Sequence, residues 1–377
     1  MTTIRDVARA AGVSIATVSR VYSGSQTVNE ETSRRVLAAG SRLDYWPNAA
    51  ARTLTTARTH TLGVLLPDLY GEFFSEVIRG IDQAARQERL QILVSGSHAD
   101  AETIISVARS MRGRVDGLIV MAPDQTSASA LEQLMRVYPM VLLNGPAGFD
   151  GCDTISIANF QGAHALLRHL LSLGHRRIAL LRGPAGNVDA EDRRQGYRAA
   201  LREVGLEPDP ALEIPGAFTE ESGYAAADAL LSISPAPSAV FAANDGMAIG
   251  LLSALLDRGR RVPQDIAVAG FDDIAAARYL NPPLTTVRVD AFELGRRAVA
   301  LWSGNGNGKE KRAERLNEVL PVRLVVRGSC GWRPADAGAA DRPVRRARAP
   351  AARSRSAGRS TGPSAEGRPR APGMTAP

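Results

Sequence analysis

The sequence predicts two kinds of fold in one chain: an all-α helix-turn-helix headpiece at the N-terminus, and then a two-lobed α/β domain with parallel sheets and helices on both faces. The headpiece is indicated by two short amphipathic segments joined at Gly12, the pattern of a helix-turn-helix. The α/β domain is indicated by residues 62–327, where short apolar runs alternate with helix-length segments. About ten such units in about 270 residues exceed one comfortable core, so we expect two similar lobes with a cleft between them.

The apolar runs are nearly continuous, which indicates strands that are buried on both faces of a sheet. These runs are residues 62–67, 90–94, 116–121, 140–143, 177–181, 239–243 and 266–270.

The composition excludes some classes of protein. With 44% hydrophobic and 23% charged residues among 377, the chain has the composition of an ordinary globular protein. It contains no apolar run of about 18 or more residues, and no basic stretch leads into an apolar one at the N-terminus. We therefore expect neither export nor membrane insertion, and a cytoplasmic location.

The cysteines and histidines suggest neither a disulfide framework, nor a metal site, nor any cofactor. Cys152 and Cys330 lie far apart without CxxC spacing, as expected for two reduced thiols of a cytosolic protein. His164 and His169 are five positions apart, which does not place them on one helical face as a metal pair requires.

The net charge of +7 is unevenly distributed along the chain. Residues 331–377 hold ten arginines against three acidic residues, residues 1–59 hold eight against four, and residues 60–330 carry −4 overall. The basic part of the folded protein is therefore at the N-terminus. Gly, Ala, Pro, Arg and Ser dominate the last segment, so we expect a disordered tail over residues 331–377. Its arginines can add weak DNA affinity, but a solvated tail without a specific role is the favoured interpretation.

Local signals at the start of the chain predict the first two helices. Thr3, with Asp6 three positions on, resembles a capping box and starts the first helix. Gly12 suits a sharp exit, after which Ser14 can cap a second helix. The apolar faces consist of Ile4, Val7, Ala8 and Ala11 in the first helix and of Val18, Val21 and Tyr22 in the second.

A third helix is expected to start at Asn29 and to bury Val36, Leu37 and Leu43. Gly40 lies inside this segment and costs about 1 kcal/mol relative to Ala, which weakens the helix at that point.

The second helix leaves a polar and small-residue face free, and such a face fits a major groove. Ile15 and Ala16 can touch thymine methyl groups, whereas Arg20 can bond guanine through its two acceptors. Thr17 and Ser19 can reach phosphate or a base edge. The alternative is a helical pair that serves only for packing.

The sequence around these helices closely resembles a known family. Residues 3–21 read TIRDVARAAGVSIATVSRV, residues 46–54 read WPNAAARTL, and residues 61–66 read TLGVLL. These segments resemble the lactose-repressor and galactose-repressor family of bacterial transcriptional regulators, and the resemblance extends over residues 3–328. It implies a sequence-specific DNA-binding repressor that is controlled by a small molecule. It also implies that the DNA-contacting set includes Thr3, Ser14, Asn29 and Ala51.

The resemblance further implies a hinge helix over residues 47–55 that forms on operator DNA and inserts a leucine, here Leu54, into the minor groove. Pro47 suits the first turn of such a helix, and the alanines at 49–51 let two copies pack closely while an apolar wedge unstacks a base step. The alternative is a helical linker that makes no DNA contact. Tyr22, Asp44 and Thr55 depart from residues that are common in the family.

From residue 60 onward the family is similar to periplasmic sugar-binding proteins, which implies a ligand between the lobes. Most of the matched positions follow predicted strands, where open α/β sheets bind ligands. Their chemistry suits a polyhydroxylated or purine-like molecule, because aromatic faces pack on a ring while carboxylate, amide and guanidinium groups bond its polar edge. The expected effector contacts are Phe73, Phe74, Asn144, Arg193, Phe218, Asn244 and Asp272.

Each of these residues has a structural alternative. Phe73 or Phe74 can be core aromatics, and Asp272 can be a turn residue beside Asp273. Arg193 can pair with a neighbouring acid, Glu191 or Asp192, on a helix surface.

These observations divide the chain into a headpiece over residues 1–46, a hinge and linker over 47–59, an effector-binding and dimerisation domain over 60–330, and the tail. We expect a homodimer on palindromic DNA, because the tail lacks the leucine heptads through which some relatives form tetramers.

Two other functions fit the sequence less well. An exported or cytosolic sugar-binding protein without a DNA function would have no use for the headpiece. An enzyme is disfavoured because residues 303–309 resemble a phosphate loop only faintly, with Glu310 after the lysine where Ser or Thr belongs.

Overall fold

The computed structural model describes residues 2–22, 27–46, 58–98, 100–146, 148–304 and 315–331. The predicted hinge helix with Ala51 and Leu54, and the predicted tail apart from Gly331, lie outside the described residues. None of the helices in these ranges combines the length and the apolar composition that a membrane span requires.

The headpiece consists of three helices whose ends follow the predicted local signals. The Asp6 carboxylate accepts hydrogen bonds from the Thr3 backbone N–H at 2.9 Å and from the Thr3 hydroxyl at 2.7 Å, and Gly12 leaves the first helix with φ 63. The Ser14 hydroxyl accepts from the backbone N–H of Thr17 at 3.1 Å. The helices are α1 (Ile4–Ala11), α2 (Ile15–Tyr22) and α3 (Glu30–Arg42).

The helices of the headpiece share a small core, and one predicted member of it is wrong. Val7, Val18 and Val36 are fully buried at its centre. Leu37 was expected in the core but is 50% exposed. It lies one position, or about 100° of helix rotation, beyond Val36 and so points away from the face that packs.

Gly40 belongs to the regular part of α3, and its missing side chain has a structural use. An ideal Cβ on Gly40 would lie 1.8 Å from the hydroxyl oxygen of Tyr22. The Tyr22 ring therefore occupies the space that a larger residue would fill, and it packs edge-on against Tyr45 at 5.5 Å. Asp44 follows α3 with φ 47, a left-handed conformation that glycine adopts freely and that aspartate tolerates better than most residues.

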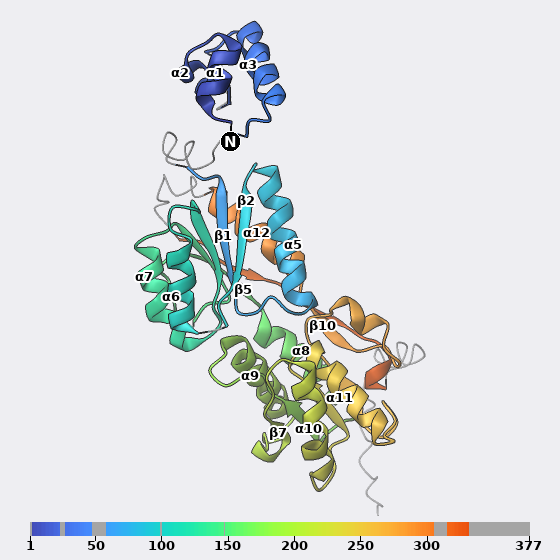
Figure 1. Cartoon of the computed structure of the whole chain (residues 1–377). Coiled ribbons are helices and arrows are strands. Elements are labelled where there is room, and N and C mark those ends of the chain that lie inside the picture. Colours follow the sequence, from blue (N-terminus) through green and yellow to red (C-terminus); the bar gives the residue numbers. More distant parts are fainter. Residues whose placement is uncertain are drawn as a thin grey trace, which may run out of the picture. The chain divides into compact units, whose positions relative to one another are not determined.

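The first lobe is built on a six-stranded parallel sheet with the order β11-β5-β4-β3-β1-β2 (Figure 1). Its longest covering helices pack very closely, because ideal Cβ atoms on Gly80 and Gly295 would lie 2.0 and 2.2 Å from backbone carbonyl oxygens of the opposite helix. Its strands are β1 (Thr61–Leu66), β2 (Gln91–Gly96), β3 (Gly117–Met121), β4 (Met140–Leu143), β5 (Asp153–Ile157) and β11 (Asn317–Leu320), and its helices are α5 (Glu72–Gln87), α6 (Ala101–Ser110), α7 (Ala128–Met135) and α12 (Ala291–Gly304).

The second lobe is built on a four-stranded parallel sheet with the order β7-β6-β8-β9. A separate antiparallel pair, β10 with β12, lies where the chain passes between the lobes before α12 and after β11. The elements are α8 (Asn159–Ser172), β6 (Ile178–Leu181), α9 (Val188–Glu203), β7 (Glu213–Ile214), α10 (Glu220–Ser232), β8 (Ala239–Ala242), α11 (Asp245–Asp257), β9 (Ala267–Ala269), β10 (Thr286–Arg288) and β12 (Arg323–Val325).

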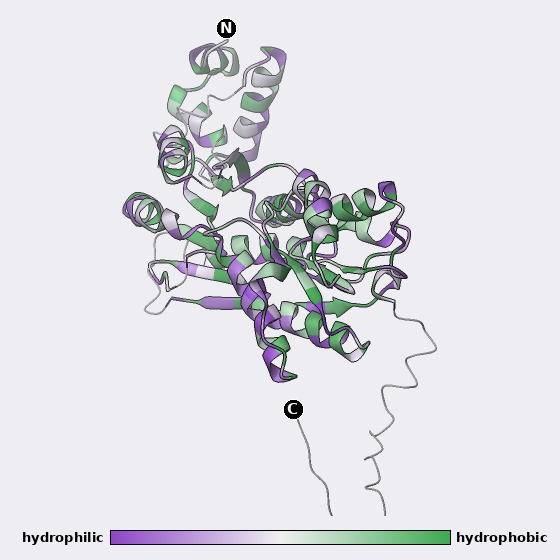
Figure 2. Ribbon diagram, turned by 90° about the horizontal axis from the view of Figure 1, so that it is seen from below, coloured by the Kyte–Doolittle hydropathy of each residue, from purple (hydrophilic) through white to green (hydrophobic). Residues whose placement is uncertain are grey.

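Burial follows the prediction in the central strands but not at the sheet edge. All residues of β3, β4, β6, β8 and β9 are buried, and Figure 2 shows hydrophobic colouring concentrated where helices and strands face one another. β2 was predicted to be buried on both faces, yet none of its residues is fully buried, and Gln91 and Leu93 are exposed. It is an edge strand with a neighbour on one side only, so its side chains are less covered.

Candidate DNA-binding surface and ligand cleft

The face of α2 that was predicted to meet DNA is open to solvent. Ser14, Ala16 and Arg20 are exposed, and Ile15 is 45% exposed. Thr17 and Ser19 are half-buried, and the Thr17 hydroxyl lies 2.9 Å from that of Ser14. An exposed isoleucine in the first turn and an exposed arginine in the last turn of a second helix suit contacts with thymine methyl groups and guanine.

Thr3 and Asn29 are exposed and stand at helix N-termini. Thr3 donates to Asp6, and the Asn29 side chain accepts from the backbone N–H of Thr32 at 2.8 Å. Both residues therefore have structural roles as caps, and the N–H groups that they border are suited to phosphate.

A cavity of about 410 Å³ lies between the two lobes. Six of the seven predicted effector residues line it, and the exception is Asn144. The first lobe contributes Asp68, Tyr70, Glu72, Phe73, Phe74, His98, Met121 and Asp124 to the lining, and the second contributes Asn187, Asp189, Arg193, Phe218, Glu220, Asn244 and Asp272.

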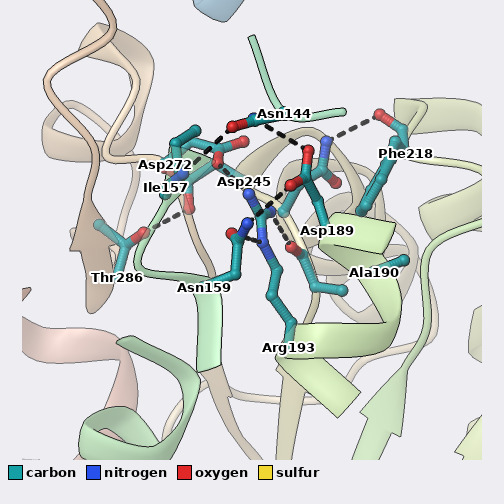
Figure 3. Close-up of polar contacts among 12 residues, drawn as sticks. Asn144, Ile157, Asn159, Asp189, Ala190, Arg193, Phe218, Asp245, Asp272 and Thr286 are labelled. Atoms are coloured by element: carbon teal, nitrogen blue, oxygen red, sulfur yellow. Dashed lines mark hydrogen bonds and ion pairs between the residues drawn. The ribbon is translucent and has the colours of Figure 1, made fainter. Parts of the chain in front are cut away.

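Arg193 is the central cation of this cavity. Although it projects from α9, it is only 4% exposed, so the alternative that it pairs with Glu191 or Asp192 on a helix surface is wrong. Its Nε donates to Asn159 Oδ1 at 2.8 Å, and its Nη2 lies 3.2 Å from Asp272 Oδ1. The guanidinium carbon lies 3.8 Å from the centre of the Phe271 ring. Packing and hydrogen bonds from several elements therefore fix the group in one orientation (Figure 3).

Asp272 follows β9 at the carboxyl edge of the second sheet, in a backbone conformation with φ 112. Its side chain is 10% exposed, and its Oδ1 accepts no hydrogen bond. Burial raises the pKa of Asp272 to about 6, although Arg193 acts in the opposite direction. Asp272 therefore lines the cavity, while its Oδ1 is buried against the Arg193 guanidinium.

Asp273, the next residue, has different partners from Asp272. Its buried carboxylate pairs with Arg327 at 2.6 Å and also with Arg288. Both arginines belong to the segments around β10 and β12 that connect the lobes. The turn therefore places one carboxylate in the cavity and the other on the connecting strands.

Asn144 lies behind the cavity rather than in its lining. It is 3% exposed, its Oδ1 accepts from the backbone N–H of Ile157, and its Nδ2 donates to Asp189 Oδ2, each at 3.1 Å. Asn159 Nδ2 donates to the other oxygen of Asp189 at 2.7 Å. Burial raises the pKa of Asp189 to about 6. The sequence interpretation missed Asp189, although it lies in the first turn of a helix that follows a strand.

Phe218 and Asn244 are coupled to each other. Asn244 caps α11, its Oδ1 accepting from the backbone N–H of Met247 at 2.9 Å. Its Nδ2 donates to the backbone carbonyl of Phe218 at 2.8 Å, so one amide hydrogen is left for a ligand. The Phe218 ring packs onto Gly183, where an ideal Cβ would lie 2.3 Å away.

Phe73 and Phe74 begin α5 and both contribute to the cavity and to the core. Their rings meet edge-on, with centroids 5.5 Å apart, and both are half-buried against the main hydrophobic cluster. Both residues therefore belong to the core and to the cavity lining at once.

Carboxylates dominate the polar lining of the cavity. Its acidic members are Asp68, Glu72, Asp124, Asp189, Glu220 and Asp272, against Arg193 and His98. Because like charges repel an anion in a site of low dielectric, the cavity disfavours phosphates and carboxylates and suits a neutral ligand that is rich in hydroxyl groups.

A helix-turn-helix headpiece together with a ligand cavity between two α/β lobes defines the class of DNA-binding transcriptional regulators that respond to small molecules. Comparison with known proteins supports this class. The family described as bacterial regulatory proteins, lacI family, matches residues 3–48, and the periplasmic binding protein-like domain matches residues 167–330.

Relatives over most of the chain are repressors. The chain is 37% identical to the ribose operon repressor of Escherichia coli (strain K12), over 87% of this chain and 100% of the relative. It is 33% identical to the HTH-type transcriptional repressor PurR of Haemophilus influenzae (strain PittEE), over 87% and 98%. A structure of the lac repressor dimer bound to operator and the anti-inducer ONPF has 32% identity and a TM-score of 0.79, and the match covers 87% of this chain and 99% of that one. The chain belongs to the lacI family of bacterial regulatory proteins and is a DNA-binding transcriptional regulator, not an enzyme.

Proposed function

We propose that the chain is a cytoplasmic, homodimeric repressor that binds palindromic operator DNA and is controlled by a neutral sugar in the cavity between its lobes. The observation that carries the sugar assignment is the Arg193–Asp272 pair, which lines the cavity and is held under aromatic rings. Such a pair can donate to one hydroxyl of a sugar and accept from another, while phenylalanine faces cover the ring.

The size and charge of the cavity support a monosaccharide. A volume of about 410 Å³ is near the small end of ligand sites, and the acidic lining opposes anionic ligands. Two relatives point the same way. One is the ribose operon repressor. The other is a LacI-family regulator from Enterococcus faecium with bound ribose, 29% identical over 71% of this chain and 98% of that one, with a TM-score of 0.64. A pentose is therefore the first ligand to test.

A purine is the second candidate. The aromatic side chains of the cavity can stack on a nucleobase, and one relative is the repressor PurR. The two candidates differ in the groups that they require, because a nucleobase offers no pair of adjacent hydroxyls for Asp272.

For DNA we propose that the exposed face of α2 reads the major groove, with Ile15 and Ala16 on thymine methyl groups and Arg20 on guanine. Thr3, Ser14, Thr17, Ser19 and Asn29 are assigned to the phosphate backbone or base edges. Ala51 and Leu54, in the segment outside the described residues, are assigned to hinge pairing and to the minor groove. This assignment follows the proposed division into residues 1–46, 47–59, 60–330 and the tail.

The test has two parts. Titration calorimetry with D-ribose, D-glucose and hypoxanthine identifies the ligand class, and we expect saturable binding of a sugar. Operator fragments are then selected from genomic DNA, and affinity is measured with and without that sugar. We expect a change of roughly five- to 150-fold, the usual range of allosteric coupling. Hypoxanthine binding without sugar binding would contradict the sugar assignment, and equal affinity for selected and random DNA would contradict sequence-specific repression.

A further inference from the structure

The edge of the first sheet at which its strands begin carries a dense set of arginines. Strand pairing places the first residues of all six strands side by side, for example Thr61 with Gln91, Leu62 with Gly117 and Leu118 with Met140. The helix ends and loops that lead into these strands therefore gather at the same edge. They carry seven exposed arginines, here called the amino-edge patch: Arg86, Arg89, Arg109, Arg112, Arg114, Arg136 and Arg315.

The arginines of this patch outnumber the acids around them, and most of them form no ion pair among the described residues. Among the described residues, only Arg86 forms an ion pair, with Asp82 at 2.9 Å. Asp116 lies at the same edge, but its carboxylate already accepts from the backbone N–H groups of Thr59 and His60 at 2.6 and 2.8 Å. The exposed acids on the same helix ends and loops are Glu88, Glu132 and Asp150.

Neither helix stability nor overall charge explains the patch. Only Arg86 and Arg109 stand in the last turn of a helix, where a cation favours the helix dipole. Arg112, Arg114 and Arg315 lie in loops. Residues 60–330 carry −4 overall, and the opposite, carboxyl edge of this sheet contributes Asp68, Glu72 and Asp124 to the cavity. The lobe is therefore positive at one edge of its sheet and acidic at the other.

The length of the chain keeps this edge near the DNA. Trp46, the last described residue of the headpiece, is fifteen positions before Thr61, where β1 begins, and fifteen residues span at most about 50 Å. The edge itself is about 24 Å wide, five spacings between neighbouring strands. A positive surface of that width, tethered to a DNA-reading unit, is suited to several phosphates of a duplex.

We propose that the amino-edge patch is a second DNA-contacting surface, which binds phosphates of the same duplex that the headpiece reads. Its arginines add affinity without sequence preference and raise the salt dependence of binding. The headpiece supplies the specificity.

The test compares two triple variants of the full-length chain with the same change in net charge. Arg109→Gln/Arg112→Gln/Arg114→Gln removes the centre of the patch. Arg202→Gln/Arg260→Gln/Arg278→Gln removes three exposed arginines from the second lobe, none of which forms an ion pair among the described residues. Binding to a 40-bp duplex of random sequence is measured by fluorescence anisotropy between 50 and 200 mM NaCl, together with the thermal unfolding midpoint. The duplex length is set at about 40 bp so that it extends well beyond one DNA-reading unit.

Each lost phosphate contact lowers the slope of log Kd against log salt concentration by about 0.9. We therefore expect the slope of the patch variant to be lower than that of the wild type by at least about 1, and the slope of the second-lobe variant to equal that of the wild type. One lost contact removes about a three- to four-fold change in affinity between the two salt concentrations.

A wild-type slope in the folded patch variant would overturn the proposal, and so would an equal loss in both variants, because net charge alone would then explain it. If the triple variant does not fold, Arg112→Gln/Arg136→Gln, which changes positions outside the helices, carries the same test. The Arg20→Ala variant, which is changed on α2, is expected to lose sequence preference but to keep the part of the salt dependence that the patch contributes. A failure of headpiece recognition can therefore be distinguished from a failure of the patch.

Discussion

The Asp272→Asn substitution is expected to stabilise the ligand-free protein at neutral pH while it weakens effector binding. Burial raises the pKa of Asp272 from 3.8 to about 6, so the folded protein holds a proton on this carboxylate more tightly than the unfolded chain does. The resulting stability is present below pH 4 and is lost as pH rises to 6 and above. Two pKa units correspond to about 3 kcal/mol, and an asparagine, which carries no charge, avoids this loss.

The neighbouring acids strengthen the effect. Asp272 is one of the causes that raise the pKa of Asp189 and of Asp245. When Asn replaces it, both of these carboxylates ionise at a lower pH, so the stability of the variant depends less on pH than that of the wild type.

The measurement is the thermal unfolding midpoint of ligand-free protein at pH 4.5, 6 and 7.5. We expect the unfolding midpoint of the variant to rise relative to that of the wild type as pH increases. We expect its sugar affinity to fall at least about tenfold, which is the effect of losing one hydrogen bond to a charged group. The control is Asp273→Asn, which removes a partner of two arginines and should destabilise the protein at every one of these pH values. A difference between the Asp272 variant and the wild type that does not change with pH would refute the argument from burial.

Three further substitutions test other parts of the molecule. Arg193→Lys should lower sugar affinity, measured by calorimetry, by about 100-fold, because one ammonium group cannot replace the guanidinium fork that contacts Asn159 and Asp272. If the variant also lost operator binding in the absence of sugar, the loss would be due to a folding defect instead. Arg20→Ala should cost about 1 to 3 kcal/mol at one base pair, seen as relaxed preference in competition with single-base operator variants; uniform weakening on all of them would assign Arg20 to phosphate. Leu54→Ala should weaken operator binding much more than random-DNA binding at fixed salt, and equal losses would exclude a minor-groove wedge.

The elements that the sequence predicts well are those that depend on neighbours three or four positions apart. The caps at Thr3 and Ser14 and the exit at Gly12 are interactions within one turn, and the structure places each of them as expected. The central strands follow from composition alone, because a run such as that of β3 has no polar residue to expose. The short strand β7, only two residues long, carries too little pattern for such a prediction.

Interactions between distant segments could not be read from the chain. Arg193 has acids beside it in sequence, and local spacing therefore favours a surface pair as much as a buried one. In the structure Arg193 pairs instead with Asp272, which is 79 positions away in sequence, because α9 and the carboxyl end of β9 meet at the cavity. The support of Asp189 by Asn144 and Asn159 comes from two further elements in the same way.

Local sequence signals were sufficient for the headpiece and for the alternation of strands and helices, and the family resemblance supplied six of the residues that line the cavity. Tertiary structure decided which polar groups are buried and which charges gather. Arg89 and Arg315 belong to one surface only because six parallel strands begin at the same edge. The physical reason is that hydrogen bonds within a turn are encoded over a few residues, whereas burial and electrostatic fields depend on which segments the whole fold brings together.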